Sequence, residues 1–382
     1  MRTTMLRWDK LTGWSGHGSD IDTANLVLYF GSREALEIEA TYRQLRALAP
    51  QAIILGCSTG GQIEESEIKD DTIDAVALHF QATRVKGASR PIEDQGRSFS
   101  VGEEIGRALA APDLAGMFVL ADGLGVNGSA LVAGVTSVAG SVPLTGGLAG
   151  DGVDFGQTLV GFDAPPTRNT VAAVGFYGSA IKIGHGSAGG WDVFGPKRQI
   201  TRSHGNVLID LDGHPALDLY VRYIGDEEVK KLPASALLFP LRVYDPAHPE
   251  HAVVRSVLAV DQEKKTLTFA GDVPEGWTAQ LMRGSFYHLT EGAALAAKQS
   301  RDGLTTYRDR DGLAILISCI GRRMLMGQRT VDEIEAASEI LGPHLQKIGF
   351  YSYGEIAPHG VSGVCVLHNQ TMTITTITEA AA

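Results

Sequence analysis

The chain has 382 residues, of which 44% are hydrophobic and 20% charged, so it can bury a full core in two or three domains, and a small disulfide scaffold is excluded. Its net charge of -11, without a dense Lys/Arg run, disfavours nucleic acid and anionic membranes as partners. No apolar stretch reaches the roughly 20 residues of a membrane span, and no signal peptide opens the chain, so we expect a cytoplasmic protein without membrane insertion.

Strands and helices alternate in the first 150 residues, after a polar, Gly-rich arm or lead-in strand in the first 20. Residues 25–30 form an apolar strand, and the next helix has Ser32 as its expected N-cap. A strand ending at Leu55 follows. The later elements are a strand at 73–82, a helix at 100–110, a strand at 115–123, a helix at 127–140 and a strand with a glycine loop at 142–152. This alternation predicts a sheet covered by helices.

Strands dominate the next part of the chain. Residues 157–162, 169–178 and 180–191 read as strands, and residues 254–276 read as a hairpin with a polar turn. A helix near 290–300 and a strand at 312–321 come next.

The last part of the chain begins with a predicted helix. Thr330 and Glu333 match a capping box, and helical spacing runs on to Gly349 with a possible break at residues 342–343. The chain then reads as an extended "YSYGEI" and two strands, at 361–367 and 371–378.

Two glycine-rich loops, "GCSTGG" and "LTGGLAGDG", are of a kind that can cradle phosphate through backbone N–H groups. Neither matches a P-loop or a dinucleotide fingerprint, so plain turns are favoured. Cys57 in the first loop could be a nucleophile, but a buried thiol is commoner. Cys57, Cys319 and Cys365 are far apart in sequence, and we expect reduced thiols.

His185 and His204 lie in a Gly-rich region beside Trp191. Imidazoles between glycines and aromatic walls suit a haem iron or a flat ligand. A loop histidine bonded to the backbone is an equally good interpretation of each. His185 and His204 are therefore candidate metal ligands.

The C-terminal region concentrates polar and reactive side chains. In an extended "YSYGEI" Tyr351, Tyr353 and Glu355 share one face, and His368 and Gln370 likewise share a face. Cys319 and His368 would suit a thiol-dependent hydrolase or transferase, although no nucleophile motif surrounds Cys319. A polar ligand pocket or structural hydrogen bonding are the alternatives. The candidate ligand-binding residues are Trp191, Cys319, Arg322, Tyr353, Glu355, His368, Asn369 and Gln370.

With these motifs the sequence resembles the FIST family of sensory proteins. "GCSTGGQI" and "VPLTGGLAGD" resemble signatures of its N-terminal domain, and "SCIGRRMLMGQR", "GFYSYGEI" and "LHNQTMT" resemble those of its C-terminal domain. The resemblance covers residues 25–379. It implies a small-ligand sensor, with amino acids or their derivatives as the proposed ligand class, and it does not imply an enzyme.

One branch of the family, the NosP type, consists of stand-alone proteins that sense nitric oxide through haem and regulate histidine kinases. The two-domain layout here is similar, which implies a haem cofactor and a separate signalling partner such as a histidine kinase. His204 stands where the family pattern leads us to expect Glu. A ligand-free interaction scaffold is a further alternative.

For the fold we expect an α/β protein of two packed domains with mixed β-sheets covered by helices. The predicted domains are residues 1–221 (FIST_N-like) and 222–382 (FIST_C-like). Whether two sheets stack in an αββα-like arrangement or each domain has its own core is left open by the pattern.

Overall fold

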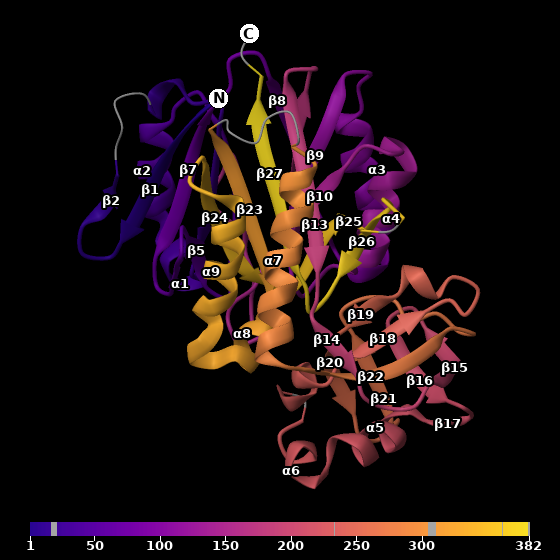
Figure 1. Cartoon of the computed structure of the whole chain (residues 1–382). Helices are drawn as coiled ribbons and strands as arrows, with labels where there is room; N and C mark the ends of the chain where they lie inside the picture. The colour runs from indigo at the N-terminus through magenta and orange to yellow at the C-terminus, as the bar shows by residue number, and fades with distance from the viewer. Residues whose placement is uncertain (17–20, 233, 305–310, 361, 381–382) are drawn as a thin grey trace.

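A computed structural model describes residues 1–16, 21–232, 234–304, 311–360 and 362–380. Parts of the predicted N-terminal arm and the first residue of the predicted strand 361–367 lie outside this set. Three six-stranded mixed sheets form the main body, and helices cover them (Figure 1). The α/β prediction is confirmed. In the described part of the chain, no helix is long and apolar enough to cross a membrane.

The same four-stranded unit occurs in all three sheets. Within each unit, the second and third strands in chain order are parallel and are joined through helices. The fourth strand is antiparallel to the second and lies on its other side, and the first strand lies next to the fourth at the edge of the unit. The spatial orders are β4-β3-β7-β1, β10-β9-β12-β8 and β24-β23-β27-β13. The molecule is therefore built from three repeats that share a topology.

The elements of the first repeat are β1 (Arg2–Asp9), β2 (Gly13–Ser15), η1 (Ile21–Thr23), β3 (Leu26–Gly31), α1 (Arg33–Leu36), α2 (Glu39–Leu48), β4 (Ile53–Ser58), β5 (Gln62–Glu64), β6 (Glu67–Lys69) and β7 (Ile73–His79). Those of the second are β8 (Arg84–Pro91), η2 (Gln95–Arg97), α3 (Ser98–Leu109), β9 (Leu114–Ala121), α4 (Gly128–Ala139), β10 (Leu144–Leu148), β11 (Val160–Phe162) and β12 (Thr170–Tyr177). The predicted N-cap is confirmed, because the Ser32 hydroxyl accepts from the Ala35 N–H at 3.2 Å.

The elements of the third repeat are β13 (Ile181–Ala188), α7 (Phe286–Asp302), β23 (Gly312–Cys319), α8 (Ile320–Met326), η5 (Gly327–Arg329), α9 (Thr330–Leu341), β24 (Leu345–Ser352), β25 (Gly354–Pro358), β26 (Cys365–His368) and β27 (Met372–Glu379). The predicted helix up to Gly349 ends early. Gly342, with φ of 77°, terminates α9, and the chain then enters β24.

A glycine marks the same place in the third strand of each repeat. A Cβ at any of these glycines would lie 1.8–2.2 Å from a carbonyl oxygen of the parallel neighbouring strand, so a larger residue would force the strands apart. The glycines and the residues opposite them are Gly56 with Tyr29, Gly146 with Val119, and Gly349 with Leu316. This match shows which loops of the three repeats are equivalent.

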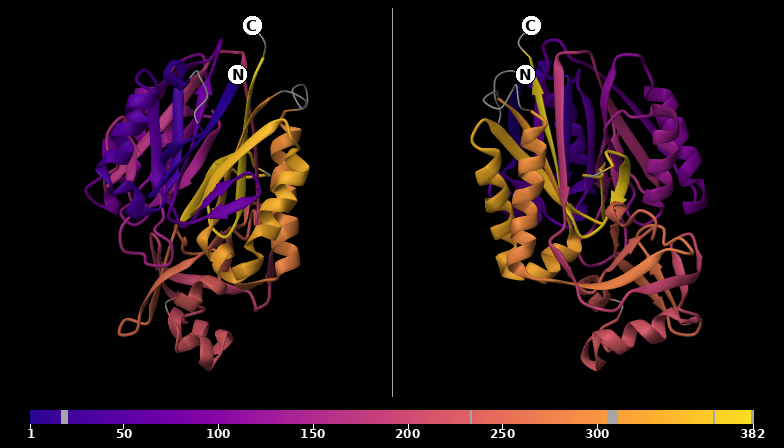
Figure 2. Two further views of the ribbon diagram at one scale, coloured as in Figure 1. Left: turned by 90° about the vertical axis from the view of Figure 1, so that its left-hand side faces the viewer. Right: turned by 45° about the vertical axis from the view of Figure 1, so that its right-hand side comes forward.

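One apolar core lies between the three sheets. Phe30, Phe118 and Phe350 belong to a single buried cluster to which strands of all three repeats contribute. The helices pack on the outer faces: α2 on the first sheet, α3 and α4 on the second, and α7 and α9 on the third. Figure 2 shows the orange and yellow helices of the third repeat and the purple helices of the second on different sides of the sheets. The arrangement is thus three sheets around a shared core.

The repeats also exchange strands in a cycle. After its third strand, each repeat sends an extension to the sheet of another repeat: β5 pairs with β24, β25 with β10, and β11 with β4. Each sheet therefore contains a strand from another repeat, which ties the three units into one body.

A smaller β-rich subdomain is inserted into the third repeat between β13 and α7, and it lies below the three sheets in Figure 1. It has its own core around Phe269 and Tyr220. The predicted boundary between residues 221 and 222 falls inside its helix α5 and stays a prediction. Its elements are β14 (Trp191–Val193), β15 (Arg198–His204), β16 (Val207–Leu211), β17 (His214–Pro215), α5 (Ala216–Ile224), α6 (Asp226–Val229), η3 (Ala234–Leu238), β18 (Leu241–Tyr244), η4 (Pro249–His251), β19 (Val253–Arg255), β20 (Val257–Asp261), β21 (Thr266–Phe269) and β22 (Thr278–Gly284).

Candidate functional site

The segments that end β4, β10 and β24 and the loops that follow them, which carry the sequence motifs, meet in the main body. Three of the backbone hydrogen bonds between them form a ring, in which each repeat donates one bond and accepts one. The bonds run from Gly60 N–H to Tyr351 C=O at 2.7 Å, from Gly150 N–H to Ser58 C=O at 2.9 Å, and from Tyr353 N–H to Leu148 C=O at 3.3 Å. Two of the glycine N–H groups that could have bound phosphate are therefore used between strands, as expected of structural turns.

Tyr353 holds the loop that follows β10. Its hydroxyl donates to the Asp151 carboxylate and to the Gly152 carbonyl, the latter at 3.1 Å. The other carboxylate oxygen of Asp151 accepts from the N–H groups of Gly156 and Gln157, at 2.8 and 2.7 Å. The ring of Phe155 stacks on Tyr353, with centroids 4.5 Å apart. Burial raises the pKa of Tyr353, so its hydroxyl stays a donor.

Glu355 is a fully buried carboxyl two residues further on. Its Oε1 accepts from the Ser352 hydroxyl at 2.7 Å, and its Oε2 accepts from the hydroxyl and N–H of Thr371 at 2.8 and 3.1 Å. Burial raises the pKa of Glu355 to about 8, against the hydrogen bonds and the charge of Arg322, which lower it.

Arg322 and Glu333 form an ion pair that is completely buried. The Nε and Nη2 atoms of Arg322 donate to Glu333 Oε2 at 2.9 and 2.6 Å, and Ser318 and Tyr351 donate to Oε1 at 2.9 and 3.0 Å. The predicted capping box is therefore wrong, since the Glu333 side chain turns into the core instead of back to its own helix end. Nothing in the local sequence distinguishes this carboxylate from a helix cap.

Asn369 and Gln370 form the turn between β26 and β27 and are both fully buried. Neither amide atom of Asn369 has a hydrogen-bond partner among the described residues. Gln370, at φ of 62°, donates through Nε2 to Leu237 C=O at 2.8 Å and to the Ser256 hydroxyl at 2.9 Å, while its Oε1 is unpartnered. Trp191 Nε1 donates to the Gln370 carbonyl at 2.8 Å. Buried amide atoms without partners are costly, so Asn369 and Gln370 are exceptions to the usual pairing of buried polar groups.

A pocket of about 260 Å³ lies beside this turn, between the loop after β10 and the inserted subdomain. Phe155, which stacks on Tyr353, forms one wall, and Leu237, which accepts from Gln370, forms another. The residues that line the pocket are Val153, Asp154, Phe155, Leu237, Val257, Leu258 and Met324. The sequence interpretation missed all seven, because they become neighbours only when the subdomain packs against the main body.

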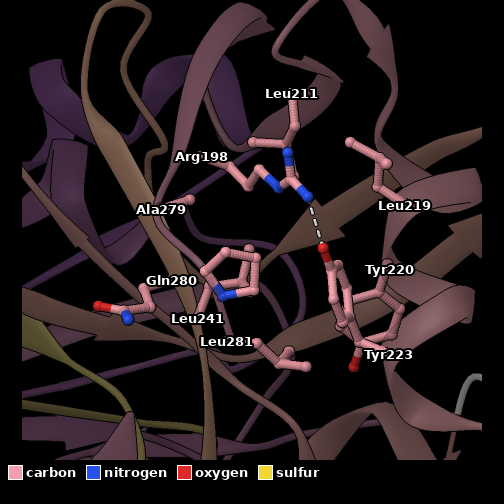
Figure 3. Close-up of a pocket in the computed structure, with 10 residues that line it drawn as sticks. Arg198, Leu211, Leu219, Tyr220, Tyr223, Leu241, Ala279, Gln280 and Leu281 are labelled. Carbon is pink, nitrogen blue, oxygen red and sulfur yellow. Dashed lines mark hydrogen bonds between the residues drawn. The ribbon is translucent and has the colours of Figure 1, made fainter. Parts of the chain in front are cut away.

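A second pocket, shown in Figure 3, lies within the inserted subdomain between α5 and strands β15 and β22. The Arg198 guanidinium donates to the Tyr223 hydroxyl at 2.5 Å across it. The free space is about 20 Å³, which holds about one water molecule. This pocket is too small for a ligand.

The two candidate haem ligands lie in different parts of the molecule. His185 is on β13, on the face opposite Gly184 and Gly186, which pack against α7; burial lowers its pKa. His204 is exposed at the end of β15 in the inserted subdomain. Neither lines the 260 Å³ pocket.

Cys319 and His368 also have separate surroundings. Cys319 lies at the start of α8 beside Glu355 and Arg322, and burial raises the pKa of its thiol. His368 contacts the Ala357 carbonyl at 3.1 Å and stacks on His359, and burial lowers its pKa to about 3. A protonated, buried thiol is a poor nucleophile. The remaining predicted residues, Trp191, Arg322, Tyr353, Glu355, Asn369 and Gln370, lie around the junction of the three loops and the inserted subdomain.

Comparison with known proteins supports the motif assignments. Residues 25–214 match the FIST N domain, and residues 216–358 match the FIST C domain. A search of curated proteins finds no match to the chain. Among solved structures, a cyanuric acid hydrolase from A. caulinodans is similar over 99% of both chains, with 10% sequence identity and a TM-score of 0.42.

Proposed function

The chain belongs to the FIST family, whose domains sense small ligands in signal transduction, and on this basis we propose that the 260 Å³ pocket is its sensory site. The observation that carries the proposal is the direct contact between the pocket walls and the signature residues. Phe155 stacks on Tyr353, and Leu237 accepts from the buried Gln370. A ligand that displaces either wall would change the contacts of Tyr353 or Gln370, which lie at the junction of the three repeats.

The lining of the pocket suggests the class of ligand. Its walls are mainly apolar, and one lining residue, Asp154, is an exposed carboxylate that lies 3.9 Å from the Arg33 guanidinium. The volume of the pocket is just below the range of about 300–1,000 Å³ that is usual for ligand pockets, so the ligand should be small. These features favour a small molecule with an apolar body and an amino group, such as an amino acid or its derivative.

A thermal-shift screen with amino acids and their amine derivatives tests the proposal. At a hundredfold excess over Kd, binding stabilises the protein by about 2.7 kcal/mol. With an unfolding entropy of about 0.8 kcal/mol/K for a chain of this length, the midpoint rises by about 3 °C. If no compound of this class shifts the midpoint, the proposal is wrong.

A matched pair of variants locates the site. Met324→Trp places an indole in the pocket and should abolish the ligand-dependent shift. Leu295→Trp makes a similar change at an exposed position of α7 and should leave the shift intact. Equal shifts in both variants would place binding elsewhere.

A haem-based nitric oxide sensor is the alternative that the family resemblance supports, with His185 or His204 as the iron ligand. Protein purified from cells supplied with haem precursor would then show a Soret band that shifts with nitric oxide. His185→Ala and His204→Ala tell the two ligands apart, because loss of the true ligand alters the band. Protein that stays colourless when haem is supplied would refute the haem alternative and leave amino acids or their derivatives as the ligand class.

For the output we propose a separate cytoplasmic signalling partner such as a histidine kinase, as the family resemblance implies. Co-purification with the chain as bait, with and without the ligand identified above, tests this. A kinase whose capture or autophosphorylation rate is the same with and without ligand would not be the partner.

A further inference from the structure

A cluster of metal-ligand side chains lies on the inserted subdomain, outside the pocket. The sequence "HPEH" at residues 248–251 forms the short helix η4 between β18 and β19. His248, Glu250 and His251 each offer one donor atom, and the three atoms all lie within 4.8 Å of one another. All three residues are exposed, so an ion can reach them from solvent.

Two of the distances within the cluster are close to those between the ligand atoms of a zinc ion. Glu250 Oε1 lies 3.3 Å from His248 Nδ1 and 3.7 Å from His251 Nε2. Ligand atoms about 2.0–2.1 Å from a tetrahedral zinc ion are about 3.4 Å apart, so the two imidazoles have to rotate toward a common ion for all three atoms to bind it. Two imidazoles and one carboxylate are a common ligand set for zinc, and water can complete the coordination.

The backbone already holds the cluster in this shape. Pro249 restricts the turn, the His251 N–H donates to the His248 carbonyl at 3.0 Å, and Arg242 donates to the Pro249 carbonyl at 3.0 Å. The His248 and His251 rings are stacked, with centroids 5.6 Å apart. The backbone of the turn is therefore ordered before a metal binds, and binding has to fix only the three side chains.

The cluster lies where the inserted subdomain meets the main body. The His251 ring packs edge-on against His359, 6.1 Å away, and His359 Nε2 contacts the Ala252 carbonyl at 3.2 Å. His359 in turn stacks on His368, the residue before the buried Asn369. A row of imidazoles therefore extends from η4 toward the buried turn.

We propose that His248, Glu250 and His251 form a binding site for a divalent transition metal ion, with zinc as the best fit. Imidazole nitrogen favours zinc, nickel and copper over magnesium and calcium, which prefer oxygen. The proposal is independent of the ligand in the 260 Å³ pocket.

Isothermal titration of the full chain with Zn²⁺, after chelator treatment, tests the site. One ion per chain should bind, and Mg²⁺ should not compete. His251→Ala and Glu250→Gln should each weaken binding at least tenfold, whereas His214→Ala, at an exposed histidine of the same subdomain, should leave it unchanged. Zinc affinity that is the same in all three variants would overturn the proposal.

Cobalt absorption supplies a second readout. Co²⁺ in a four-coordinate site gives an intense visible band, and the band should disappear in His251→Ala while circular dichroism shows an unchanged fold. Because the three side chains are exposed, we expect these variants to fold. A band that persists in His251→Ala would place the metal at other residues and refute the assignment.

Discussion

Replacing Glu355 by Gln should change the pH dependence of stability. The carboxyl group is fully buried, and its pKa rises from 4.5 to about 8 on folding because burial penalises its charged form. Below pH 4.5 the group is protonated in both states. Between pH 4.5 and 8 the unfolded chain releases the proton and the folded chain keeps it, so the stability falls as the pH rises. Above pH 8 both states release the proton, and the stability no longer changes with pH because of this group.

The size of this stability loss follows from the difference between the pKa of Glu355 in the folded and unfolded states. Each pH unit inside this window lowers the free energy of unfolding by about 1.4 kcal/mol, so the loss approaches about 5 kcal/mol across the window. Between pH 5.5 and 7.5 it should be about 2–3 kcal/mol. The amide of Glu355→Gln keeps the shape and does not titrate, so the variant lacks this component of the slope. If the substitution also changes the hydrogen bonds with Ser352 and Thr371, the unfolding free energy shifts by the same amount at every pH, and the slope is unaffected.

Urea denaturation at several pH values, followed by circular dichroism, measures the two slopes. The difference in unfolding free energy between Glu355→Gln and the parent protein should grow in favour of the variant as the pH rises from 5.5 to 7.5. Glu335→Gln, on the exposed face of α9, is the control and should show the parent slope. If the difference between Glu355→Gln and the parent stays within about 0.5 kcal/mol at all pH values, the carboxyl is ionised in the folded state and the reasoning is refuted.

Two further variants test the buried ion pair and the glycine that marks each repeat. Arg322→Ala leaves the Glu333 carboxylate buried without its counter-ion and should cost about 3–5 kcal/mol in urea denaturation, whereas Arg43→Ala, in an exposed pair with a glutamate, should cost below about 1 kcal/mol. Gly349→Ala places a Cβ 1.8 Å from a backbone carbonyl of the neighbouring strand and should lower the melting temperature steeply or prevent folding. Gly140→Ala, at φ of 64° and ψ of -126° with nothing within 4 Å, meets backbone strain but no neighbouring strand and should cost about 1–3 kcal/mol, and equal losses at the two glycines would contradict the strand-contact explanation.

The local features of this protein were predictable from the sequence. The Ser32 N-cap and the hairpin of β20 and β21 depend on residues that are neighbours in the chain, and both are confirmed. The alternation of apolar strands and helices also predicted mixed sheets covered by helices, because side-chain periodicity responds directly to burial.

Only the tertiary structure decided how these elements combine. The three repeats share strand order but no visible sequence period, since strand pairing depends on backbone hydrogen bonds that many sequences can make. The glycines at 56, 146 and 349 look like isolated turn residues until the parallel strands bring carbonyls against them.

The same distinction holds for the site. Tyr353, Glu355, Asn369 and Gln370 were identifiable as polar residues in an apolar stretch, but their partners come from distant parts of the chain. Glu333 was misjudged because its local pattern fits a helix cap, while in the folded protein the buried charge of Arg322 is the stronger partner. The sequence by itself determined which side chains carry the polar chemistry, and long-range packing decided which of them meet, because such contacts leave no periodic trace in the chain.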